Sequence, residues 1–120
     1  MKRLLIAFLA ATVCLLAADP SGKWSGTLQP TDGGEPHPAY IILKADGNKL
    51  SGSGGPDETE QHPIESGRVE GDRLIFVVPA GERTLYFDLK IKGDEIEGDL
   101  EMKKGEEKKT GKVSLKRQAP

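Results

Sequence analysis

The sequence is poor in the residues that mark reactive sites and disulfide frameworks. Its 120 residues include one cysteine and two histidines, and aromatic residues make up 5% of the chain. The cysteine, Cys14, lies within an apolar segment near the N-terminus, so the remaining chain forms no internal disulfide and offers no thiol for chemistry. The chain also lacks excess positive charge, because its 17 basic residues face 19 acidic ones. That balance argues against binding to nucleic acid or to an anionic membrane surface.

The one long hydrophobic run lies at the N-terminus and is typical of a secretory signal peptide. Lys2 and Arg3 precede an uncharged apolar run over residues 4–16, and two small residues, Ala17 and Ala18, end it. A run of this length is too short to span a bilayer stably. The order of basic, apolar and small residues predicts cleavage near Ala18.

We therefore expect residues 1–18 to be a signal peptide and residues 19–120 to form a single domain. About 102 residues are enough for one hydrophobic core and too few for two. Without the two basic residues of the signal, 15 basic residues face 19 acidic ones, a net charge of about −4. Lipidation at Cys14 is the alternative, although Val13 is larger than the residue that a lipoprotein signal places there. We expect a secreted or periplasmic protein, soluble after removal of the signal.

The rest of the sequence is rich in glycine, in proline and in alternating patterns. All 15 glycines and all 8 prolines lie after residue 18. Residues 85–92 place an apolar side chain at every second position, with a charged residue or tyrosine between. This period of two predicts strands with one face in a core and the other in water. A charged outer face also argues against membrane insertion as an outer-membrane barrel, whose outer face is apolar.

Three segments repeat the order strand, glycine-centred turn, strand. Glycine adopts positive φ without a steric clash, and Asn or Asp tolerates it, so Gly-Asn and Gly-Asp between alternating segments indicate tight hairpins. The turns are Gly47-Asn48, Gly71-Asp72 and Gly93-Asp94. They predict hairpins that pair residues 40–45 with 49–54, 64–69 with 73–79, and 84–92 with 95–103.

Two further alternating segments, residues 23–29 and 111–117, have no hairpin partner. Closing the first strand onto the last gives an all-β, eight-stranded, antiparallel up-and-down barrel without open edges. A two-sheet sandwich built from the same strands is the alternative. Residues 30–38 and 54–63 are predicted as long loops, and the Lys- and Glu-rich residues 103–110 as the solvated end of a hairpin.

Gly22-Lys23-Trp24 opens the first predicted strand, and Arg117 lies near the end of the last one. This arrangement resembles that of the calycins, which include lipocalins, fatty-acid-binding proteins and avidins. The resemblance implies a tryptophan at the closed end of the barrel and, as in lipocalins, an arginine packed across its indole. Such a cation–π contact contributes about 0.5–2 kcal/mol. The chain has neither the lipocalin Thr-Asp-Tyr-type turn nor the asparagine that follows the tryptophan in avidins. The resemblance therefore implies barrel closure by Trp24 and Arg117 and no particular ligand.

An eight-stranded barrel is either filled by its own side chains or holds one small ligand. Four glycines expected to face inward, at positions 26, 52, 54 and 98, either leave a pocket or let a large neighbour pack closely. If a cavity is present, we expect the two long loops to rim its mouth. The residues predicted to contact a ligand are Trp24, Tyr40, Leu43, Phe76, Phe87, Leu89 and Met102. The other residues expected to face inward include Leu28, Ile41, Leu50, Leu74, Leu85, Ile96, Leu100, Val113 and Leu115.

Candidate catalytic and metal-ligating residues are few. His37 and His62 each precede a proline in a long loop that also carries carboxylates, but neither has a partner at the short fixed spacing of a metal motif. No serine lies in a nucleophile-elbow pattern, and no glycine-rich turn precedes a helix. We therefore expect no metal, no cofactor and no enzymatic activity.

The leading functional hypothesis is non-catalytic binding of a small apolar ligand inside the barrel. The alternative is a filled barrel that acts as an interaction or structural module through its outer surface. Ile42, Ile75, Val77 and Tyr86 are apolar at outward positions and are the candidates for such a surface. We expect a monomer or a weak dimer.

Overall fold

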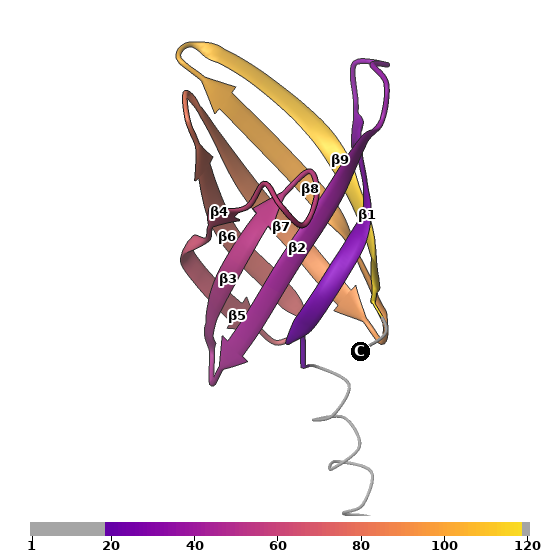
Figure 1. The fold of residues 1–120 in the computed structure, drawn as a ribbon, viewed down its shortest axis with the longest axis vertical. Helices are drawn as coiled ribbons and strands as arrows, with labels where there is room; N and C mark the ends of the chain where they lie inside the picture. The colour runs from indigo at the N-terminus through magenta and orange to yellow at the C-terminus, as the bar shows by residue number, and fades with distance from the viewer. Residues whose placement is uncertain (1–18, 119–120) are drawn as a thin grey trace, which may run out of the picture.

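The computed structural model describes residues 19–118, and these residues form strands and turns without a helix. The predicted signal peptide, residues 1–18, lies outside the described residues. No helix within residues 19–118 is long and apolar enough to cross a membrane. The strands, shown in Figure 1, are β1 (Gly22–Pro30), β2 (His37–Asp46), β3 (Lys49–Gly55), β4 (His62–Pro63), β5 (Glu65–Glu70), β6 (Arg73–Ala80), β7 (Arg83–Lys92), β8 (Glu95–Lys104) and β9 (Glu107–Arg117).

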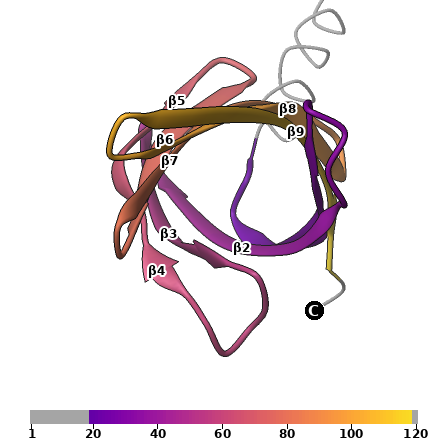
Figure 2. The ribbon, with the colours of Figure 1, turned by 90° about the horizontal axis from the view of Figure 1, so that it is seen from above.

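Eight of these strands close into a barrel, which Figure 2 shows end on. Each ring strand pairs antiparallel with its neighbours, and β1 closes the ring by pairing with both β2 and β9. The predicted eight-stranded antiparallel barrel, closed from first strand to last, is confirmed, and the sandwich alternative is wrong. The extra strand, β4, lies outside the ring, where it pairs with Ser53 and Gly54 of β3.

Two-residue turns connect most of the neighbouring strands. The three predicted hairpins are present as β2–β3, β5–β6 and β7–β8. Two more hairpins of the same kind use Gly81-Glu82 between β6 and β7 and Gly105-Glu106 between β8 and β9. The first turn residue is glycine in all five hairpins, with φ between 60° and 69°. This is the backbone that a type II′ turn requires at that position, and its twist matches that of the flanking strands.

The ring is least continuous between β3 and β5. These strands pair at two positions, Lys49 with Arg68 and Leu50 with Gly67. Next to this short ladder, the pairing of β5 with β6 shifts register between Glu65 and Arg68, and Ser66 there has a positive φ of 52°. Such an irregularity bends a strand. The bend takes β5 away from β3, and β4 pairs with the freed part of β3.

The barrel is packed solid at the end where β1 begins and β9 ends. Inward-facing side chains from seven strands are buried there, and the largest is Trp24, which is fully buried. Its indole Nε1 donates a hydrogen bond to the carbonyl of Pro20 at 2.8 Å, so the one polar group of the side chain is satisfied. The other buried residues at this end are Leu43, Leu50, Leu74, Phe76, Leu89, Ile91, Ile96 and Leu115.

Arg117 seals this packed end. It lies opposite Trp24 in the β1–β9 ladder, and its guanidinium carbon is 4.3 Å from the centroid of the indole. Its Nη1 and Nη2 donate hydrogen bonds to the carbonyls of Ser21 and Asp19, at 2.7 and 3.0 Å. Its Nε donates to Oδ1 of Asp94, in the β7–β8 turn, at 2.9 Å. One side chain thus connects the segment before β1, the first strand, the last strand and a turn.

We predict that Arg117→Ala lowers the free energy of unfolding by about 1–3 kcal/mol, because it removes the cation–π contact and the charged hydrogen bonds. Arg117→Lys restores only part of this loss. The ammonium keeps the positive charge, but it lacks the planar fork that reaches three acceptors. Urea unfolding followed by tryptophan fluorescence measures the change. Arg73→Ala is the matched control, because the ion pair of Arg73 with Asp88 is exposed and contributes little. An unchanged midpoint for Arg117→Ala would contradict the sealing role.

Candidate ligand cavity

The other half of the barrel is hollow. A cavity of about 440 Å³ lies there, within the size range of small-molecule sites. Its wall is mostly apolar and comes from Leu28, Ala39, Ile41, Val78, Ala80, Leu85, Phe87, Leu100 and Met102. Residues of both long loops line the mouth, among them Asp32, Gly34, Pro56 and Glu60, so the prediction that these loops rim a cavity is confirmed. The interior of the barrel is therefore filled by side chains in one half and hollow in the other.

A stacked pair of phenylalanines lies where the packed half meets the cavity. The rings of Phe76 and Phe87 are parallel to within 17°, with centroids 4.7 Å apart. Phe87 lines the cavity, whereas Phe76 does not and is almost completely buried. The pair thus forms part of the boundary between solid core and hollow.

Two of the residues predicted to contact a ligand, Phe87 and Met102, line the cavity. The remaining five do not line it. Four belong to the packed end of the barrel, where they are buried among other core side chains: Trp24, Leu43, Phe76 and Leu89. Tyr40 lies between the cavity-lining Ala39 and Ile41 on β2, so the alternation of the strand turns its side chain outward.

The sequence signal that the prediction missed is side-chain size along each strand. On four strands the inward side chains are large at the packed end and small toward the mouth, where they are Ala39, Gly54, Ala80 and Gly111. This decrease in volume on four strands leaves the space that the cavity occupies. Alternation predicts whether a side chain points into or out of the barrel. It does not predict the position of the residue along the barrel axis.

The inward glycines have two different roles. A Cβ at Gly26 would lie 1.8 Å from the carbonyl oxygen of Ser114, and one at Gly98 would lie 2.4 Å from that of Asp88. These glycines, and Gly52 in the same way, let neighbouring backbones approach closely. At Gly54 a Cβ would meet only side chains at 3.6 Å or more, and this glycine lines the cavity. Gly54 therefore leaves room in the hollow, while the others allow the strands to pack.

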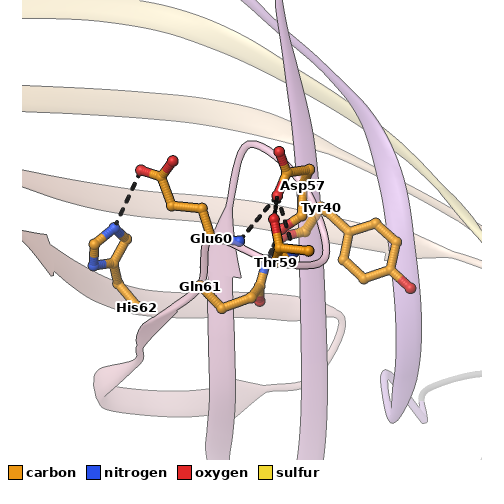
Figure 3. Close-up of polar contacts among 6 residues, drawn as sticks. All are labelled: Tyr40, Asp57, Thr59, Glu60, Gln61 and His62. Carbon is orange, nitrogen blue, oxygen red and sulfur yellow. Dashed lines mark hydrogen bonds and ion pairs between the residues drawn. The ribbon is translucent and has the colours of Figure 1, made fainter.

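The loop between β3 and β4 is held together by Asp57, as Figure 3 shows. Oδ1 of Asp57 accepts hydrogen bonds from the amides of Thr59 and Glu60, both at 2.9 Å, and from the Thr59 hydroxyl at 2.7 Å. The amide nitrogen of the Gln61 side chain donates to the carbonyls of Asp57 and Tyr40, at 2.8 and 3.0 Å. The loop is thus fixed to β2 beside the mouth of the cavity.

The hydrogen bond from the Thr59 hydroxyl, followed by those from the Glu60 and Thr59 amides, holds the pKa of Asp57 below its ordinary value. A lowered pKa means that the carboxylate stabilises the loop above the ordinary pKa of an aspartate. This contribution is lost as the pH falls through the lowered value.

We predict that the amide resonances of Thr59 and Glu60 titrate together in acid, with an apparent pKa below that of an unperturbed aspartate. Thr59→Val removes the hydroxyl donor and raises that apparent pKa, and Asp57→Asn abolishes the titration. Two-dimensional NMR spectra recorded against pH measure both effects. An apparent pKa at or above the ordinary value in the unmodified protein would show that these hydrogen bonds do not order the loop.

Charged and titratable side chains line the mouth and not the depth of the cavity. They are His37, His62, Arg83, Lys109, Asp32 and Glu60. No polar or charged side chain among residues 19–118 is fully buried. The two histidines share this mouth, but the carboxylates beside them, Asp32 and Glu60, are exposed. Within the described residues, no group of three or more His, Cys, Asp or Glu side chains is placed to hold a metal ion.

The outer surface carries little exposed apolar area. Ile42, Ile75 and Val77 are half-buried, and in the described part of the chain Tyr86 is the one large apolar side chain that is exposed, at 40%. The ammonium of Lys103 lies 5.3 Å from the centroid of the Tyr86 ring, so a charged group borders this position. The candidate outward patch is thus small and interrupted by charge.

No protein-family model matches the chain, and neither a curated protein nor a solved structure matches it. The likeness to calycins therefore stays a prediction that rests on Gly22, Trp24 and Arg117. The fold and the cavity are the basis for the function proposed below.

Proposed function

We propose that this protein binds a small apolar molecule inside its barrel and catalyses no reaction on it. The observation that carries this proposal is the contrast between the two halves of one barrel. One half is packed with large side chains and sealed by Arg117, whereas the other holds a mostly apolar cavity of about 440 Å³ that opens at the mouth. A barrel with a structural role alone gains stability from filling both halves, because an unfilled apolar wall forgoes the contacts that packing would supply.

The energetics favour a ligand that fills most of the cavity. Burying about 200 Å² of apolar ligand surface contributes about 5 kcal/mol at about 25 cal/mol per Å². Association itself costs several kcal/mol in lost freedom of motion, so a much smaller ligand binds weakly. The cavity wall consists of paired strands, and the β3–β4 loop beside it is held by hydrogen bonds. The protein therefore loses little conformational freedom when the ligand binds, so most of the free energy gained by burying the ligand is kept.

The proposal includes no catalytic step because, among residues 19–118, the mouth offers no arrangement that activates a nucleophile or a proton donor. His62 lies 3.8 Å from Glu60, a carboxylate whose side chain is 65% exposed. A solvated carboxylate of this kind does not provide the shielded acid that general acid–base catalysis uses. We further propose that the protein acts after export, in the periplasm or outside the cell, as a monomer or weak dimer.

Ala39→Leu tests the proposal, because Ala39 lines the cavity and the larger side chain occupies part of it. We expect the neutral fluorescent probe N-phenylnaphthylamine to bind the unmodified protein in the micromolar range, and Ala39→Leu to weaken that binding about tenfold. The measurement is a fluorescence titration, accompanied by circular dichroism and urea unfolding to show that the variant folds.

Two control variants add or change side chains outside the barrel. Thr27→Leu puts the same side chain on an exposed position of β1, and Val77→Asp disrupts the candidate outer surface. Both variants should bind the probe as the unmodified protein does. Binding that survives Ala39→Leu would place the site outside the cavity. An unmodified protein that binds no probe would contradict the proposal.

A further inference from the structure

We infer that the ligand carries an anionic group, which Arg83 and Lys109 hold at the mouth while its apolar part fills the cavity. This inference rests on the proposed function. It names the chemical class of the ligand, which is an organic anion with an apolar tail. A carboxylate is the simplest example of the anionic group.

The two cations lie on β7 and β9, the two strands that flank β8, next to apolar positions that line the cavity. Arg83 begins β7 and is followed on the same face by Leu85 and Phe87, which both line the cavity. Lys109 stands near the start of β9, and Met102 of β8 is the cross-strand partner of both Leu85 and Lys109. A molecule with its tail between these apolar side chains therefore has its end next to the guanidinium and the ammonium.

Arg83 has no anionic partner within the described residues. None of the ion pairs formed by residues 19–118 includes Arg83, and Lys109 has one, with Glu107, at a long 4.0 Å. Arg83 therefore faces the cavity mouth without an ion-pair partner, and Lys109 has only a long contact.

The charge next to Arg83 adds to this imbalance. Its cross-strand partner in the β7–β8 ladder is Lys104, so two like charges lie directly opposite each other. Such pairs destabilise a sheet. Two carboxylates offset this in part: Glu82, 4.0 Å from Lys104 and mostly exposed, and Glu107, which lies opposite Lys104 in the β8–β9 ladder. An anion bound at the mouth would remove the repulsion, so binding and the stability of this hairpin pair are linked.

The two acidic side chains that line the mouth are engaged elsewhere. Oδ1 of Asp32 accepts a hydrogen bond from the amide of Gly34 at 3.0 Å, within its own loop. Glu60 lies beside His62, with 3.8 Å between the carboxylate oxygen and Nε2. The remaining mouth residue that can carry charge is His37, on β2. Both acids keep their negative charge, but neither forms an ion pair with Arg83, so the guanidinium of Arg83 is the group at the mouth that is free to bind an anion.

Guanidinium groups bind carboxylates through two parallel hydrogen bonds, a geometry that an ammonium cannot reproduce. We therefore assign the larger share of the recognition to Arg83 and a point-charge contribution to Lys109. Both groups are exposed to solvent, so the contribution falls as ionic strength rises.

Three compounds with an unbranched chain of ten carbons test the inference: decanoate, decanol and decyltrimethylammonium. Each competes with N-phenylnaphthylamine for the cavity at low salt and below its micelle concentration. We expect decanoate to bind about tenfold more tightly than decanol, and decyltrimethylammonium to bind most weakly, because a charge-assisted hydrogen bond outweighs a neutral one. Salt should weaken the binding of decanoate and leave that of decanol nearly unchanged.

The double variant Arg83→Gln, Lys109→Gln should weaken decanoate about tenfold more than decanol. Lys23→Gln is the matched control, because Lys23 is an exposed lysine on β1 at the packed end. Lys23→Gln should leave the ratio of the affinities for decanoate and decanol unchanged from that of the unmodified protein.

Each failure has its own meaning. Equal affinities for decanoate and decanol, or preference for the ammonium compound, would overturn the anionic ligand and leave the apolar cavity site intact. A double variant that keeps the full preference for decanoate would overturn the assignment to Arg83 and Lys109. A protein that binds neither the probe nor any of the three compounds would overturn the proposed function, and this inference with it.

Discussion

The contact between the Trp24 indole and the Arg117 guanidinium is the interaction on which the rest of the structure depends. It joins the first strand of the barrel to the last, which is the pairing that closes the ring. Because the same guanidinium donates to carbonyl oxygens before β1 and to Asp94, the end of the barrel is covered as well as closed. A barrel sealed at this end can be solid there and hollow toward the other, and the cavity opens at the mouth rimmed by the two long loops.

Much of the fold could be predicted from the sequence because its determinants are local. Alternation gives the face of each residue, and a glycine at the first turn position gives the hairpin, so the eight ring strands follow. The seal between Trp24 and Arg117 was expected from a resemblance that covers a few residues. Strand β4 was not predicted, since it forms only where β5 bends away from β3 at Ser66, and that irregularity has no periodic signature.

The apolar character of the candidate site could be predicted from the sequence, but its position in the barrel could not. The sequence indicates an apolar interior, and Phe87 and Met102 do line the cavity. Leu43 and Leu89 face inward as alternation requires, yet they lie in the packed half. Height along a barrel depends on the stagger between strands, which non-local pairing sets. The cations at the mouth were missed because Arg83 and Lys109 lie on β7 and β9, and only the register of both strands against β8 places them at the same end of the barrel.

The central claim is that the hollow half of the barrel is a binding site. NMR measurement of intermolecular contacts between bound N-phenylnaphthylamine and side-chain methyl groups tests it most directly. The account predicts contacts to methyl groups that line the cavity, those of Leu28, Ile41, Leu85 and Leu100, and none to those of Leu74 and Leu115 in the packed half. Contacts confined to the outer face, at Ile75 and Val77, would contradict the claim and point to the outer surface instead.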